Sequence, residues 1–213
     1  MKISKIVNKD AKNVIVHFDN DEVLFLSVDM FYKSSLKKDD EISDDRFSSL
    51  IKENRLFYIK QRAFRYLGRR QHSTSELRIK LKQKGYETEL INQVLDDLKQ
   101  KNYLDDTKFA EMFVEEKIKL KLWGEQKLRS ELIKRGINSE IISNILQNII
   151  SDEDKLNNAM TVASKKYDSL KNRNVDRDVI KRNLISFLNS RGYNYDVIKE
   201  VCEMLIIEND NYD

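Results

Sequence analysis

Leucines, a cation and a glycine recur in one fixed order at three places along the chain. Each copy is anchored on a glycine, and the three glycines stand 51 and 56 residues apart. Two leucines stand eight and four residues before each glycine, a Lys or Arg stands one before it, and a carboxylate stands four after it. Agreement at this many positions indicates an internal repeat. The copies are Leu77, Leu81 and Gly85; Leu128, Leu132 and Gly136; and Leu184, Leu188 and Gly192.

One copy of the repeat predicts a helix, a tight turn and a second helix. Residues four apart lie on one face of a helix, so the two leucines belong to a buried stripe. The cation lies in the last turn of the helix, where it complements the negative end of the helix dipole. The glycine supplies the left-handed residue that ends the helix, and the carboxylate opens the next one. Because a further helix precedes each pair, the repeat predicts three-helix modules.

Residues 1–50 follow a different pattern. Apolar and β-branched residues fill Val14–Phe18 and Val23–Leu26 on either side of a polar turn, which predicts a β-hairpin. Ile3–Val7 is a candidate third strand, and Ser27 is a candidate cap of a short helix. The predicted fold class is therefore mainly α, with three tandem helix-turn-helix-like modules behind a small β-containing segment. The predicted divisions are 1–50, 51–102, 103–150, 151–208 and a frayed tail at 209–213.

Polar residues at fixed spacing mark where the helices begin. Ser73 and Glu76 have the spacing of a capping box at the start of the second helix of the first module. Asp105 is the expected N-cap of the first helix of the second module, and Trp123–Gly124 is expected to end that helix. These signals support the module boundaries that the repeat predicts.

Composition constrains the environment of the protein. The chain has no proline and five glycines, which suits long helices, and its one cysteine, Cys202, cannot form an internal disulfide. A reducing cytoplasm is therefore the expected location, with Cys202 as a buried small apolar residue. No apolar run is long enough for a signal peptide or a membrane span. Because no heptad seam is present, we expect a monomer.

Over roughly residues 55–205, the chain resembles the RecX family, whose members are regulatory proteins of the bacterial recombinase RecA. The resemblance runs from Ala63 through the first copy of the repeat, then through Tyr103–Asp106 and Phe109–Ala110, and then from Gly124 through the second copy. It implies a non-enzymatic protein that binds the RecA recombinase or the RecA–DNA filament. It further implies that the protein modulates, and mainly inhibits, filament assembly, ATPase activity and strand exchange in DNA repair, recombination and the SOS response.

The cations are concentrated in the middle of the chain. Residues 55–85 carry ten cations against one acid, and residues 117–135 carry seven against two. Such clusters are either solvated helix faces or one shared basic surface for DNA phosphates, single- or double-stranded, or for acidic patches of a protein filament. The spacing of seven places Arg62 and Arg69 on one helical face with Arg65 nearby. The predicted contact residues are Arg62, Arg65, Arg69, Arg70, Lys80, Lys84, Lys119, Lys121, Trp123, Lys127 and Arg129.

Aromatic residues next to these cations have two interpretations. Tyr86 and Tyr193 follow the glycines of the first and third copies, and each is either an apolar lock on the helix turn or a platform for base stacking. The turn position favours the lock. Trp123 is either a core anchor or, beside Lys119 and Lys121, part of an interface.

An enzymatic site is not predicted. The two histidines, His17 and His72, have no cysteine or second histidine at metal-ligand spacing, and capping accounts for the adjacent carboxylates Asp105 and Asp106. We therefore expect no metal and no cofactor. The alternative function is sequence-indifferent DNA binding by tandem helix-turn-helix-like modules. Direct base readout is disfavoured because the third helices carry few candidate amides, such as Asn92 and Gln93.

Overall fold

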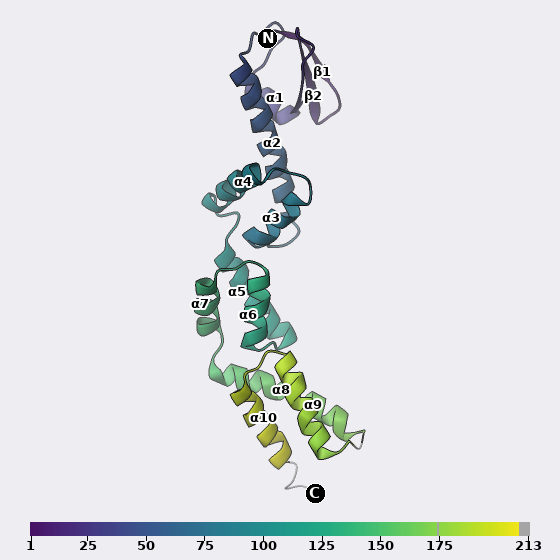
Figure 1. Cartoon of the computed structure of the whole chain (residues 1–213), viewed down its shortest axis with the longest axis vertical. Helices are drawn as coiled ribbons and strands as arrows, with labels where there is room; N and C mark the ends of the chain where they lie inside the picture. Colours follow the sequence, from purple (N-terminus) through teal and green to yellow (C-terminus); the bar gives the residue numbers. More distant parts are fainter. Residues whose placement is uncertain (174, 209–213) are drawn as a thin grey trace. The chain divides into compact units, whose positions relative to one another are not determined.

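The computed structural model describes residues 1–173 and 175–208, and Figure 1 labels most of its elements. The predicted frayed tail at 209–213 lies outside the described residues. The chain divides into two compact units. The first unit comprises Met1–His72 and Leu77–Leu104, and the second comprises Ser73–Glu76 together with the chain from Asp105 onward.

The first unit begins with an antiparallel sheet of order β1-β2-β3. Its strands are β1 (Ile3–Asn8), β2 (Asn13–Phe18) and β3 (Val23–Ser27), as the alternation of apolar residues predicts. Val14 and Val16 of β2 are buried, because every second residue of a strand points to the same face. Ser27 accepts a hydrogen bond from the amide of Met30 and caps α1 (Val28–Ser34).

Helix α2 (Asp44–Leu67) belongs to two cores. Its first half packs against the sheet through Leu50, which is fully buried, and its second half contributes Ile59 and Ala63 to the core of the first module. Asn54 ties the helix to β3, since its side-chain amide donates to the Phe25 carbonyl at 2.7 Å and its oxygen accepts from the Ser27 amide at 3.0 Å. The predicted division between residues 50 and 51 falls inside this helix.

The first module is completed by α3 (Thr74–Lys82) and α4 (Thr88–Gln100). Leu77 and Leu81 are fully buried beside Ile91 and Leu95 of α4. Gly85 lies in the turn between the two helices with φ of +81°. The turn is left-handed, as the repeat predicts.

The second module consists of α5 (Asp106–Lys121), α6 (Glu125–Lys134) and α7 (Ser139–Ile149). Asp105 caps α5 by accepting from the amides of Thr107 and Lys108. Leu128 and Leu132 are fully buried, and Gly136 has φ of +71°.

The expected end of α5 at Trp123–Gly124 is wrong in detail. The left-handed residue is Leu122, with φ of +49°, whereas Gly124 has φ of −76° and is the N-cap of α6. Leu122 occupies this conformation because its side chain packs on the core of the third module. Packing therefore places the left-handed residue at Leu122, although glycine at position 124 would adopt this backbone at lower cost.

The third module consists of α8 (Asp152–Lys171), α9 (Arg177–Ser190) and α10 (Tyr195–Glu208). Ser151 and Asp154 form a reciprocal capping box at the start of α8. Leu184 and Leu188 are fully buried, Gly192 has φ of +87°, and Cys202 is buried in the same core. The predicted fold class, mainly α with three three-helix modules and a small amino-terminal sheet, is confirmed.

Candidate interaction site

The four arginines predicted in the first unit divide between a helix and the turn that follows it, whereas Lys80 lies on α3 and Lys84 in the turn after α3. Arg62 and Arg65 lie on α2, but the helix ends at Leu67, so Arg69 and Arg70 lie beyond it. The prediction that Arg62 and Arg69 share a helical face is therefore wrong. Helical periodicity no longer applies after residue 67, because the chain turns there to reach the start of α3.

Within the basic cluster at residues 55–85, four exposed cations make no ion pair or side-chain hydrogen bond to residues 1–173 and 175–208. We call them the free cations. By contrast, Arg55 pairs with Glu87 at 2.7 Å, Arg78 donates to Asn92 at 3.2 Å, and Lys80 lies 5.4 Å from the centre of the Tyr66 ring. The free cations are Arg65, Arg69, Lys82 and Lys84.

Cations of the second cluster are largely engaged within the second unit. Lys127 donates to the Ser190 carbonyl at 3.1 Å and lies 5.0 Å from the centre of the Trp123 ring. Arg129 contacts Glu125 at 3.4 Å and Ser143 at 3.2 Å. Lys119 and Lys121, at the end of α5, remain exposed. Because the two clusters belong to different units, the shared basic surface stays a prediction.

The aromatic residues near these cations are packed into cores. Trp123 is half-buried against Phe113, with the ring centres 6.3 Å apart. Tyr86 is partly buried on the core of the first module, and Tyr193 is buried in the core of the third. The lock interpretation of the two tyrosines agrees with this packing.

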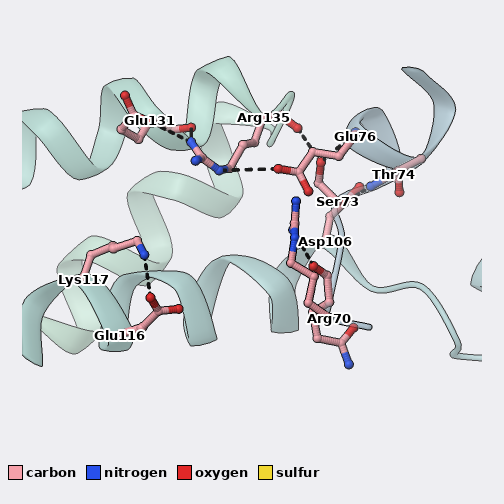
Figure 2. A network of polar contacts seen from close by, with 10 residues as sticks. Arg70, Ser73, Thr74, Glu76, Asp106, Glu116, Lys117, Glu131 and Arg135 are labelled. Atoms are coloured by element: carbon pink, nitrogen blue, oxygen red, sulfur yellow. Dashed lines mark hydrogen bonds and ion pairs between the residues drawn. The ribbon is translucent and has the colours of Figure 1, made fainter. Parts of the chain in front are cut away.

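The start of α3 contacts the end of α6 in an arrangement we call the first joint (Figure 2). The Ser73 hydroxyl donates to the Arg135 carbonyl at 2.6 Å and accepts from the Glu76 amide at 3.0 Å. The Glu76 carboxylate lies 3.6 Å from the Arg135 guanidinium. A Cβ atom at Gly136 would lie 2.5 Å from the Ser75 Cβ, so only glycine allows this approach.

Glu131 holds the arginine of the first joint in place (Figure 2). Arg135 donates to its carboxylate at 2.7 Å, and Lys134 donates to it at 2.9 Å. These hydrogen bonds hold the pKa of Glu131 below its ordinary value, because they stabilise the ionised carboxylate. Arg135 is thereby directed toward Glu76 and α3.

The start of α6 contacts the end of α9 in a second joint. The amides of Gly124 and Gln126 donate to the carbonyls of Arg191 and Gly192 at 2.9 and 3.0 Å. The Arg191 guanidinium returns a hydrogen bond to the Lys121 carbonyl at 2.8 Å. A Cβ atom at Gly192 would lie 2.3 Å from the Lys127 amide nitrogen.

The two joints use the same repeat positions. The residue twelve before one glycine, Ser73 or Gly124, donates to the carbonyl of the cation that precedes the next glycine, Arg135 or Arg191. Each joint thereby places the positive end of one helix dipole against the negative end of another. Sequence reasoning missed these contacts, although small residues at positions 73 and 124 were a visible signal.

The described residues present little that could perform catalysis. No group of three or more His, Cys, Asp or Glu side chains suited to a metal ion occurs within residues 1–173 and 175–208. His72 is buried beside Tyr66, with the ring centres 6.2 Å apart. An open groove of about 440 Å³ between α1, α2 and α4 is lined by a mixture of apolar and charged residues, with Lys60 bound to Asp97. In that same part of the chain, no helix is both long and apolar enough to cross a bilayer.

Fold and surface together define a class of protein: a helical repeat protein of three three-helix modules that presents exposed cations. Three family models match the chain, for the first, second and third three-helix domains of RecX, at residues 60–98, 105–146 and 152–202. The chain belongs to the RecX family.

Individual relatives agree with this assignment. The regulatory protein RecX of Clostridium botulinum (strain Alaska E43 / Type E3) is 31% identical over 202 residues, covering 94% of each chain. That of Clostridium acetobutylicum (strain ATCC 824) is also 31% identical over 202 residues, with 94% of each chain covered.

Solved structures support the fold. A crystal structure of regulatory protein RecX matches with a TM-score of 0.75 at 21% identity, covering 94% of this chain and 98% of that one. RecX from Lactobacillus salivarius matches with a TM-score of 0.65 at 19% identity, covering 73% and 99%.

Proposed function

We propose that this protein is a non-enzymatic regulator of the bacterial recombinase RecA. It binds RecA or the RecA–DNA filament and limits filament assembly, ATPase activity and strand exchange. Membership of the RecX family carries this proposal. The interlocked modules support it, because a chain of small domains can contact a polymer at several points, and weak contacts then add.

A direct assay tests this proposal. RecA filaments formed on single-stranded DNA are mixed with increasing amounts of the protein, and ATP hydrolysis and strand exchange are followed. We expect a decrease in both at a ratio of protein to RecA well below one. Unchanged hydrolysis and strand exchange at every ratio would contradict the proposal.

Sequence-indifferent DNA binding is the second candidate function. It is favoured by the free cations, which have no protein partner among the described residues and can neutralise phosphates. Base readout is not favoured, since Asn92 of α4 is already bound by Arg78. Fluorescence anisotropy with unrelated DNA sequences tests this function. We expect similar affinities that fall as salt is raised, and a strong preference for one sequence would exclude this candidate.

A further inference from the structure

The turn at Gly85 is a free copy of a surface that the chain uses twice for docking. Gly85, Gly136 and Gly192 share the same repeat position and the same left-handed backbone. In the second unit, the turns at Gly136 and Gly192 each receive the start of a helix. Among residues 1–173 and 175–208, the turn at Gly85 has no such neighbour, since a Cβ atom placed there would meet none of them within 4 Å.

The groups used in the joints are available at the Gly85 turn. In the second joint, the carbonyls of Arg191 and Gly192 accept from two amides of the docked helix. The equivalent carbonyls belong to Lys84 and Gly85, and among the described residues neither accepts a hydrogen bond. Lys84 stands where Arg135 and Arg191 stand, and it is exposed and free.

The geometry points to the Gly85 turn as a docking site for the first turn of a helix that belongs to a partner protein. The first turn of a helix carries amides without intrahelical partners, and these suit two free carbonyls. The positive end of its dipole suits the negative end of α3. The two joints show that the docked helix has a small residue at its start, Ser73 or Gly124, because a bulkier one would keep the turn away.

A second copy of this chain fits the site poorly. The starts of α3 and α6 are already covered in the two joints. In the third module, the residue twelve before Gly192 is Ile180, which is large, buried and inside α9, so this module offers no small residue at the position that docks in the two joints. The occupant is therefore a helix of another protein, which we take to be RecA; in this the inference rests on the proposed function.

Gly85→Asn tests the inference. Asparagine tolerates left-handed backbone, so the variant keeps the turn. Its side chain fills the space into which a docked helix would enter, and the charge of the free cations is unaltered. Gln83→Asn is the matched control, because it adds the same side chain at an exposed position two residues earlier. Thermal unfolding followed by circular dichroism establishes that both variants are folded.

The measurement is the apparent affinity for RecA filaments on single-stranded DNA, from inhibition of ATP hydrolysis. We expect Gly85→Asn to bind about tenfold more weakly, or about 1.4 kcal/mol, while Gln83→Asn behaves as wild type. If wild type inhibits and folded Gly85→Asn inhibits equally, the docking inference is wrong and the proposed function stands. If wild type has no effect, the proposed function fails, and the assignment of this partner fails with it.

Analytical ultracentrifugation of the protein alone tests whether a second copy of this chain binds at the Gly85 turn. We expect wild type and Gly85→Asn to sediment identically as monomers. Self-association of wild type that Gly85→Asn abolishes would overturn the inference, because a second copy would then occupy the turn.

Discussion

Two glycines of the chain are constrained by different physical effects. Gly85 has left-handed backbone and open space around it, so only its conformation requires glycine. Gly124 has φ of −76°, which any residue adopts, but a Cβ atom there would lie 2.3 Å from the Gly192 carbonyl oxygen. Alanine substitutions at these positions therefore separate backbone strain from steric contact.

We expect Gly124→Ala to destabilise the protein more than Gly85→Ala. Left-handed alanine at position 85 costs about 1 kcal/mol. Alanine at position 124 opens the second joint and breaks two backbone hydrogen bonds, at about 1 kcal/mol each and more if the carbonyls stay buried. Urea unfolding measures the difference, and hydrogen exchange at the Gln126 amide should accelerate in Gly124→Ala alone. Slow exchange there in Gly124→Ala would show that the joint tolerates the methyl group.

Tyr193 links the second and third modules through its hydroxyl, which donates to the Leu122 carbonyl at 2.8 Å. Burial raises the pKa of Tyr193 from its ordinary value of 10 to about 12, because the phenolate is poorly solvated there. A raised folded-state pKa means that this stabilisation is complete below pH 10 and is lost as the pH rises toward 12.

Tyr193→Phe should remove this dependence on pH. At neutral pH we expect a loss of about 1 kcal/mol for the hydrogen bond. The difference in stability between wild type and variant should narrow above pH 10, where unfolding of wild type is coupled to ionisation of this group. Absorbance at the phenolate band, titrated for both proteins, should show the latest-titrating phase in wild type alone. A phase retained in Tyr193→Phe would assign it to another tyrosine.

At the scale of the helices, two serines act as N-caps under different conditions. Ser151 caps α8 at an exposed position, where Asp154 completes the capping box. Ser73 is fully buried and both accepts from the Glu76 amide and donates to the Arg135 carbonyl. The first serine serves one helix, whereas the second joins two.

We expect Ser73→Ala to cost more free energy of unfolding than Ser151→Ala. Loss of an exposed cap costs about 1 kcal/mol. At position 73 the Arg135 carbonyl also loses a partner, which adds about 1 kcal/mol or more. Denaturant titration of both variants measures the difference. Ser73→Gly serves as a control, because glycine is tolerated at an N-cap but also lacks the hydroxyl that donates to the Arg135 carbonyl. Equal costs would mean that water replaces the Ser73 hydroxyl.

Across the whole molecule, some cations form ion pairs with carboxylates of the same chain, and the free cations do not. Cations such as Arg129 and Arg135 are held by ion pairs with Glu125 and Glu131 within the same helix. The free cations make no such contacts in the described part of the chain, so their loss should leave the fold intact. We therefore expect substitutions of the free cations to weaken binding without changing the free energy of unfolding.

We expect Arg65, Arg69 and Lys82, changed together to alanine, to weaken RecA inhibition or DNA binding by tenfold or more without loss of stability. If these residues contact DNA phosphates, each lost contact lowers the slope of log binding constant against log salt concentration by about one. The slope should therefore fall by about three. The control changes Lys12, Lys37 and Lys38 to alanine, which removes the same charge from the amino-terminal segment. If both triple variants weaken binding equally, the effect is one of net charge and not of this site.

Patterns over a few neighbouring residues predicted most of the helices, turns and caps of the three modules. The leucines at positions 77 and 81 share a helical face, and a residue such as Gly85 ends a helix through its own conformational freedom; both effects act within a few residues. The cap at Asp105 is equally local. The end of α5 is not, because the left-handed Leu122 packs against the core of the third module, which lies far along the chain.

The sequence by itself determined the repeat, the helices, the caps and the resemblance to the RecX family, because periodicity and capping depend on neighbours along the chain. Only the tertiary structure decided which cations are free and which are engaged, since Lys127 meets Ser190 and Arg135 meets Glu76 across long separations. It also decided that the turns at Gly136 and Gly192 are docked and that the turn at Gly85 is open. Identical local patterns acquire different roles when only some of them find a partner in space.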